Sequence, residues 1–185
     1  MNTINKDDTL TNELTLPPRR RVQIVVIGDG EASPHVLEVA EEIGARIART
    51  GAVLITGGHA GVMEAACRGA AANGGTCVGI IRSGDLSRAN RYCDIVIGTE
   101  IEHARNVLTV LSSDAVIAIG GGAGTLSEIC FAWIHGRPLF ILRGFGGWSD
   151  RLDDTPLDMR RSAPIHFFDS VDALFTALAP LTLRA

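Results

Sequence analysis

Residues 115–128 read AVIAIGGGAGTLSE, and this stretch joins a strand pattern to a helix pattern through a glycine turn. Residues 115–119 are continuously apolar, which is typical of a strand covered on both faces of a sheet. Residues 120–124 contain four glycines, and Thr125 opens a segment with helical spacing. The backbone N–H groups of such a turn and the positive end of the helix dipole favour an anion. The stretch therefore predicts a strand, a phosphate-binding turn and a helix.

The same alternation of strand and helix patterns runs along the chain from Val22 onward. Apolar runs predict strands at residues 22–27, 52–56, 77–81, 94–97, 115–119, 138–142 and 165–168. Helical spacing and capping residues predict helices at 34–50, 61–72, 102–111, 125–135 and 170–178, and residues 143–163 read as a long surface loop. Such alternation is typical of βαβ units around a parallel sheet. We therefore predict an α/β fold, a single Rossmann-like three-layer domain with a parallel sheet of six or seven strands.

The length of 185 residues suits one domain with one core. Residues 1–20 are polar and lack periodicity, so we expect a disordered lead-in there and a domain over residues 21–185. No apolar run approaches the roughly 18 to 20 residues that span a bilayer. The amino terminus also lacks the apolar core of a secretory signal. We therefore expect a cytoplasmic protein with no membrane partner.

Charge and residue usage exclude several classes of function. The net charge of −4 disfavours nucleic acid as a partner. Lys6 is the only lysine, so the predicted domain has no Walker-type lysine and no Schiff-base lysine for pyridoxal phosphate. The first glycine turn has Ser33 where the NAD fingerprint has its third glycine. The cysteines and histidines show no metal-ligand spacing. We expect no pyridoxal phosphate, no NAD, no metal site and no cofactor needed for folding.

Three glycine turns, at residues 28–30, 57–61 and 120–125, each follow a predicted strand. In an open α/β sheet such turns meet at the crevice where ligands bind. The alternative is that the glycines only make tight turns. We favour a ligand site, and its candidate ligand-binding and phosphate-binding residues are Gly28, Gly30, Gly57, Gly58, His59, Arg105, Gly121, Gly122, Gly124 and Thr125.

The third turn resembles a known motif. Residues 120–128 match the last eight positions of the Pro-Gly-Gly-x-Gly-Thr-x-x-Glu motif of the Lonely Guy phosphoribohydrolases, with Gly120 in place of proline. The resemblance implies that Glu128 supports glycosidic cleavage and that Arg105 pairs with the phosphate or the departing base. Two further positions depart from the family pattern, because Asn106 replaces a lysine and Ser127 replaces the first of two glutamates. These departures put hydrolysis in doubt.

Over residues 22–142 the chain more closely resembles the molybdenum-cofactor carrier proteins and their bacterial relatives. The matching stretches are residues 56–58, 61–63, 74–76, 104–106, 111–113 and the Gly124-Thr125 turn. This resemblance implies binding of a nucleotide-like, phosphate-bearing small molecule, with the molybdenum (pterin) cofactor or a nucleotide as the candidate ligand, by a carrier or sensor. The alternative is a hydrolase that releases free base and ribose 5-phosphate from nucleoside 5′-monophosphates. Relatives of this fold also imply a homodimer or homotetramer.

The two candidate catalytic residues each have a structural alternative. Thr125 and Glu128 have the spacing of a capping box, in which Glu128 would cap the amide of Thr125. Arg105 would otherwise be an exposed helix arginine. His59, likewise, would otherwise be a solvated loop residue.

Overall fold

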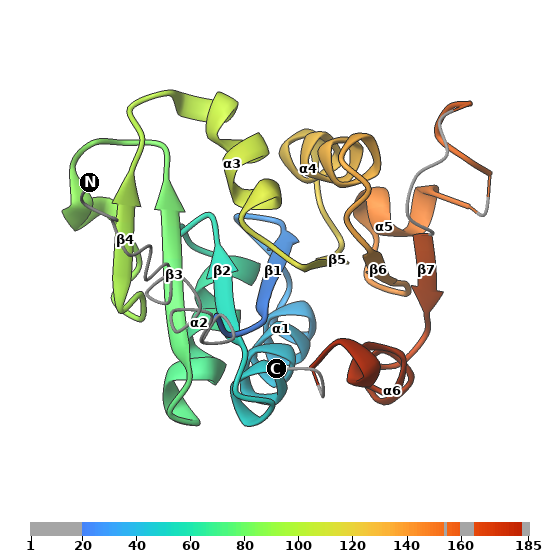
Figure 1. The fold of residues 1–185 in the computed structure, drawn as a ribbon, viewed down its shortest axis with the longest axis horizontal. Coiled ribbons are helices and arrows are strands. Elements are labelled where there is room, and N and C mark those ends of the chain that lie inside the picture. The colour runs from blue at the N-terminus through green and yellow to red at the C-terminus, as the bar shows by residue number, and fades with distance from the viewer. Residues whose placement is uncertain (1–19, 154, 160–164, 183–185) are drawn as a thin grey trace, which may run out of the picture.

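The computed structural model describes residues 20–153, 155–159 and 165–182 (Figure 1). In this part of the chain seven strands form one sheet in the order β4-β3-β2-β1-β5-β6-β7, and every neighbouring pair is parallel. The strands are β1 (Gln23–Gly28), β2 (Val53–Thr56), β3 (Thr76–Ile81), β4 (Ile95–Gly98), β5 (Ala115–Ile119), β6 (Leu139–Leu142) and β7 (Ile165–Phe168). The predicted α/β fold with a parallel sheet is confirmed.

Helices cover both faces of the sheet and complete the three layers (Figure 1). The helices α1 (Pro34–Arg49), α2 (Val62–Ala72) and α6 (Val171–Thr182) pack on one face, and α3 (Asn106–Leu111) and α4 (Ala123–Ile134) pack on the other. Two 3-10 turns, η1 (Leu86–Arg88) and η2 (Glu102–Arg105), and the short helix α5 (Gly147–Arg151) lie in the connections.

The core explains the continuous apolar runs in the sequence. In β1, Ile24 and Val26 face the α1–α2 layer, whereas Val25 and Ile27 face the α3–α4 layer. Successive strand side chains point to opposite faces. Since both faces are covered, residues 24–27 of β1 and all of β5 are buried and apolar.

Two predicted segments differ from the structure. The helix predicted over residues 102–111 is the 3-10 turn η2 followed directly by α3. The loop predicted over 143–163 contains the helix α5, which corrects that prediction. Its first turn is held by Asp150, whose carboxylate accepts hydrogen bonds from the amides of Gly144 and Gly146 at 2.8 and 2.6 Å. A helix of five residues is too short to give a periodic signal.

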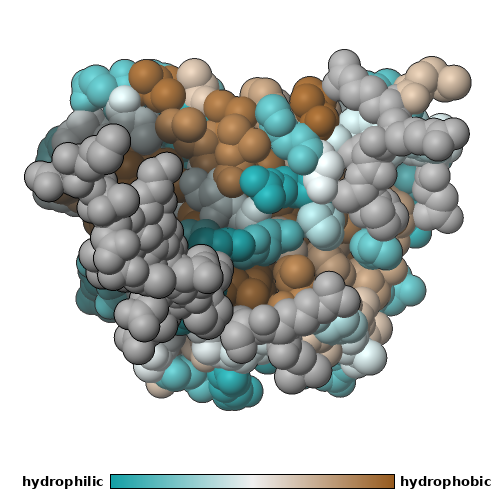
Figure 2. Space-filling view, in the orientation of Figure 1, coloured by the Kyte–Doolittle hydropathy of each residue, from teal (hydrophilic) through white to brown (hydrophobic). Residues whose placement is uncertain are grey.

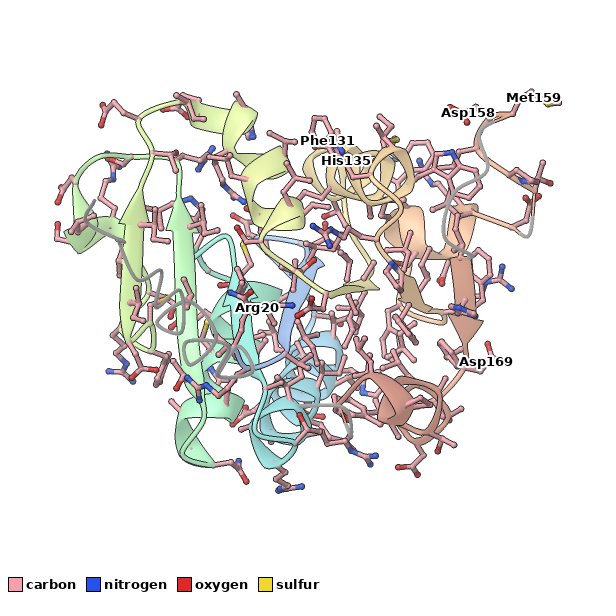
Figure 3. All side chains as sticks on the ribbon, viewed as in Figure 1. Arg20, Phe131, His135, Asp158, Met159 and Asp169 are labelled. Carbon is pink, nitrogen blue, oxygen red and sulfur yellow. The ribbon has the colours of Figure 1, made fainter. Side chains whose placement is uncertain are left out.

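The lead-in predicted over residues 1–20 lies outside the described residues except for Arg20. The guanidinium of Arg20 pairs with the carboxylate of Asp114 at 2.7 Å, beside the start of β5 (Figure 3). None of the described helices combines the length and the apolar character needed to cross a membrane.

The strand order reverses between β1 and β5. From β1 the chain builds the sheet outward through β2, β3 and β4, then returns to place β5 on the other side of β1. At such a switch point the connections after the two strands diverge to opposite faces of the sheet and leave a crevice at the carboxyl ends of the strands.

Candidate functional site

A cleft lies at this crevice and consists of two adjoining hollows. The inner hollow has a volume of about 260 Å³ and the outer one about 680 Å³. Gly30, His59 and Arg82 line both, so the two hollows meet at these residues. The volumes are in the range of small-molecule sites.

The inner hollow brings together most of the predicted site residues. Eight of them line it, from the three glycine turns, η2 and α4: Gly28, Gly30, His59, Arg105, Gly122, Gly124, Thr125 and Glu128. Gly57, Gly58 and Gly121 are not part of the lining. Each of these three glycines instead contacts another residue of the protein, as the following paragraphs describe.

Arg105 and Glu128 form a buried pair across the inner hollow. Arg105 is the last residue of η2, and Glu128 lies on the second turn of α4. The Nη1 group of Arg105 donates to Glu128 Oε1 at 3.2 Å and to Thr109 Oγ1 at 3.0 Å. The exposed fractions of Arg105 and Glu128 are 5% and 7%. The alternative of an exposed helix arginine is therefore wrong.

The capping-box alternative for Glu128 is also wrong. Helix α4 begins at Ala123 with Gly122 as its N-cap, so Thr125 lies inside the helix and not at its cap. Glu128 Oε1 accepts from Arg105 instead. The side chain of Glu128 is therefore available to the cleft that it lines.

Burial acts against the charges of both partners. It raises the pKa of Glu128 to about 7, and the opposing attraction of Arg105 is smaller. Burial likewise lowers the pKa of Arg105, against the attraction of Glu128. The Nε group of Arg105 is buried and has no hydrogen-bond partner among the described residues. A buried cation with an unpaired donor is costly for folding unless a further partner satisfies it.

Gly57 makes room for Arg105. A Cβ atom at Gly57 would lie 2.4 Å from Nη2 and 2.8 Å from Nη1 of Arg105, well inside van der Waals contact. The backbone of the second glycine turn therefore packs against the guanidinium of Arg105 and limits where it can lie. Gly58 has a positive φ and packs against β3, where a Cβ would lie 2.5 Å from a methyl group of Ile81.

The third glycine turn is hydrogen-bonded to the carboxylate of Asp29, which belongs to the first glycine turn. The amide of Gly121 donates to Asp29 Oδ2 at 2.7 Å. Asp29 directly follows β1, and the turn follows β5, so the contact depends on these strands being neighbours. Gly122, Gly124 and Thr125 remain on the cleft side of the turn. Their amides are among the first N–H groups of α4, which have no partner within the helix.

His59 contacts a residue that the sequence did not indicate. Arg82 directly follows β3 and donates from Nε to His59 Nε2 at 3.2 Å. Burial, together with the positive charges of Arg82, Arg105 and Arg88, lowers the pKa of His59. The histidine is half-buried, so the alternative of a solvated loop residue is wrong. The signal that could have found Arg82 is its position at the end of a strand, next to the turns after β1 and β2.

Within the described residues, no group of three or more histidines, cysteines, aspartates or glutamates is arranged to hold a metal ion. The lining of the inner hollow instead combines two guanidinium groups, two carboxylates, two imidazoles, an amide side chain, a hydroxyl and the backbone of the glycine turns. These are the groups that bind phosphate oxygens and the hydroxyls of a sugar.

Comparisons with known proteins find relatives of this chain. An uncharacterized protein of Archaeoglobus fulgidus is 47% identical over 123 residues, which cover 66% of this chain and 80% of that protein. The cytokinin riboside 5′-monophosphate phosphoribohydrolase of Mycobacterium tuberculosis is 34% identical over 171 residues, which cover 80% of this chain and 90% of that enzyme. The solved molybdenum cofactor binding protein of the phototrophic bacterium Rippkaea orientalis superposes with a TM-score of 0.75 at 34% identity, covering 88% of this chain and 98% of that one.

These similarities confirm the resemblance to the Lonely Guy phosphoribohydrolases and to the molybdenum-cofactor carriers. A protein-family model described as the SLOG cluster4 family matches residues 21–172, which include the whole cleft. The chain therefore belongs to the SLOG cluster4 family.

Proposed function

We propose that this protein binds a nucleotide-like ligand that carries a phosphate, and acts as its carrier or sensor. The observation that carries the proposal is Arg105, a buried guanidinium with an unpaired Nε that lines the cleft beside the glycine turn of α4. A phosphate would supply the acceptors that Arg105 and the first amides of α4 lack. Gly122, Gly124 and Thr125 would hold the phosphate, and Arg105 would neutralise it.

The candidate ligand is the molybdenum (pterin) cofactor or a nucleotide. The name of the Rippkaea orientalis protein supports the first choice. The two hollows support a ligand with two parts, since the inner hollow suits a phosphate and the outer one, at about 680 Å³, has room for a ring system. The phosphate end would then lie at α4 and the ring would point toward Ala60 and Asn90.

A second candidate function is hydrolysis of nucleoside 5′-monophosphates to free base and ribose 5-phosphate. The contact between Arg105 and Glu128 favours it, because these are the residues to which the Lonely Guy resemblance assigns catalysis. A carboxylate at this place would stabilise the oxocarbenium-like charge at the anomeric carbon or orient the attacking water. Arg105 would hold Glu128 in place and favour its ionised form. The relative from Mycobacterium tuberculosis supports this reading by its name.

Binding and hydrolysis are separated by one pair of measurements. The protein is titrated calorimetrically with AMP and GMP, and the same mixtures are analysed by chromatography for free base. A carrier binds without releasing base, and Glu128→Gln keeps most of the affinity. A hydrolase releases base, and Glu128→Gln abolishes the release while the variant stays folded.

The shared binding site is tested with Gly124→Asp. The new carboxylate would face the phosphate at the start of α4, so we expect the affinity for the tighter of AMP and GMP to fall at least tenfold. Ala177→Asp adds the same charge on the exposed side of α6 and serves as the matched control. An unchanged affinity in Gly124→Asp would remove the proposed site, and no binding to the unmodified protein would remove the proposed ligand class.

We also propose that the protein self-associates, as a homodimer or homotetramer, through α3 and α4. Leu108, Leu111 and Ile134 are between 39% and 46% exposed on these helices. Figure 2 shows apolar surface over α3, and Figure 3 places Phe131 on the neighbouring helix α4 and His135 at its C-terminal end. Light scattering should give a multiple of the chain mass, and Leu108→Asp should lower it. A monomeric mass for the unmodified protein would refute the proposal.

A further inference from the structure

Arg82 joins three loops of the cleft. Its Nε donates to His59 Nε2 at 3.2 Å, and its Nη1 lies 3.4 Å from His103 Nε2. His59 follows β2, Arg82 follows β3, and His103 lies in η2 after β4. These strands are neighbours in the sheet, so one guanidinium connects the loops at three successive carboxyl ends.

The loop that carries His103 has an unusual backbone. Glu100 and Glu102 have φ values of 56° and 48°, the left-handed region that residues with a side chain rarely adopt. The Glu100 carboxylate accepts a hydrogen bond from the amide of Gly84 at 2.5 Å, which ties this loop to the one that follows Arg82. Such backbone outliers persist where surrounding contacts hold them, and they cluster at ligand sites.

Two guanidinium groups, of Arg82 and Arg105, and two carboxylates, of Asp29 and Glu128, line the inner hollow. No carboxylate of the described residues forms an ion pair with Arg82. Arg82 and Arg105 both line the inner hollow, and the charge of Arg82 lowers the pKa of Arg105. Of the carboxylates in the inner hollow, Glu128 is paired with Arg105 and Asp29 is bound to the amide of Gly121.

The remaining carboxylates line only the outer hollow. Glu31, Glu64 and Glu102 lie there, with Arg88 among them. Arg82 is therefore the guanidinium of the inner hollow that has no carboxylate partner among the described residues, whereas Arg105 is paired with Glu128.

We propose that Arg82 and Arg105 are the two arms of a clamp for one terminal phosphate monoester, and that His59 and His103 position Arg82 for this contact. The inference rests on the proposed function and narrows its ligand class. A phosphate monoester carries close to two negative charges at neutral pH and has three terminal oxygens, so two guanidinium groups can each bind it through two oxygens. A cyclic diester has one charge and two free oxygens, and it cannot satisfy both arms.

The clamp is tested by calorimetry with whichever of GMP and AMP binds more tightly, and with the corresponding 3′,5′-cyclic monophosphate. We expect the unmodified protein to bind the cyclic compound at least tenfold more weakly than the monoester. We expect Arg82→Gln to lose about tenfold or more in affinity for the monoester. Arg91→Gln removes the same charge from an exposed arginine of the same connection, outside both hollows, and should stay within twofold.

Arg82→Lys keeps the charge without the planar fork, so it should bind the monoester with an affinity between those of the unmodified protein and Arg82→Gln. This variant also decides the question if Arg82→Gln does not fold. If Arg82→Gln folds and binds the monoester with unchanged affinity, the clamp is overturned. If it does not fold, unchanged affinity in both Arg82→Lys and Arg91→Gln overturns the clamp. In either case the proposed function remains. Equal affinity of the unmodified protein for monoester and cyclic diester would also overturn the clamp and leave the proposed function standing. No binding of GMP or AMP at all would remove the proposed function itself.

The positioning role of His59 has its own readout. Glutamine at this position offers an oxygen that can accept from Arg82 Nε, whereas alanine offers none. We expect His59→Gln to keep the monoester affinity within about threefold and His59→Ala to lose at least fivefold, with similar melting temperatures. Equal loss in the two variants would overturn the positioning role.

Discussion

Asn106 Nδ2 donates a hydrogen bond to Ser127 Oγ at 2.7 Å, so two of the positions at which this chain departs from the Lonely Guy pattern contact each other. Ser127 Oγ donates in turn to the carbonyl of Gly124 at 2.6 Å, within the glycine turn. A neutral pair thus stands where the family resemblance places a lysine and a glutamate. Because both charges are absent together, the net charge of the site is the same as with the lysine and the glutamate.

The effects of Asn106→Lys and Ser127→Glu on the unfolding free energy should therefore be coupled. Asn106→Lys alone places an ammonium group in a buried position beside Arg105, and Ser127→Glu alone places a carboxylate next to Glu128. We expect each single variant to lose about 1–2 kcal/mol of unfolding free energy and the double variant to recover at least half of the summed loss. Urea unfolding of the four proteins measures the coupling. Losses that simply add would contradict the contact.

Glu128 should make stability depend on pH. Burial raises its pKa from 4.5 to about 7 in the folded protein. Between these values the folded protein holds a proton that the unfolded chain has released. The contribution of this group is therefore fully present below about pH 4.5 and is lost as the pH rises to about 7, by up to about 3 kcal/mol.

Glu128→Gln removes this titration, so the unfolding free energy of the variant should change less between pH 5 and pH 7. Urea unfolding at pH 5, 6 and 7 compares the two proteins directly. Parallel pH profiles would show that Glu128 does not titrate in this range. Asp172→Asn, which neutralises an exposed carboxylate on α6, is the control and should leave most of the profile in place.

Gly57→Ala should displace Arg105. The added Cβ would lie 2.4 Å from Nη2 of Arg105 and 2.8 Å from the sulfur of Met63, so the guanidinium must move. We expect a loss of about 1–3 kcal/mol in unfolding free energy, as for other overpacked sites, and weaker binding of GMP and AMP. In an Arg105→Ala background the same substitution should cost clearly less. An equal cost in both backgrounds would mean that Gly57 is kept for another reason.

Much of this fold follows from local sequence. The strands of the sheet centre are continuous apolar runs because helices cover both faces, and the helix at 34–49 is marked by Ser33, whose side chain accepts from the amide of Val36, and by Pro34. The glycine turns mark the cleft because they follow strands whose carboxyl ends meet. Helix α5 escaped prediction since tertiary contacts hold it: the amides of Trp148 and Ser149 donate to the carbonyls of Gly121 and Gly120.

The site itself is only partly local. Glu128 and Arg105 could be named from the motif, whereas Arg82 is marked only by its position after a strand, because its partners His59 and His103 are 23 and 21 residues away. Its role appears only when β2, β3 and β4 lie side by side. The contact of Asp29 with the amide of Gly121 spans 92 residues and likewise requires β1 and β5 to be neighbours.

Asp29→Asn should change stability and ligand affinity in opposite directions. The carboxylate accepts from Gly121 at 2.7 Å at the start of α4, where a negative charge interacts favourably with the helix dipole. Asparagine keeps an acceptor oxygen but loses the charge, so we expect unfolding free energy to fall by about 0.5–1 kcal/mol. The same charge repels a phosphate at the neighbouring amides, so the affinity for GMP or AMP should rise. Calorimetry tests the expected rise in affinity, and urea unfolding of the same preparations tests the expected fall in unfolding free energy. If the affinity falls instead, the carboxylate contacts the ligand itself, as it would by accepting from a ribose hydroxyl, and the phosphate must then lie farther toward Arg105.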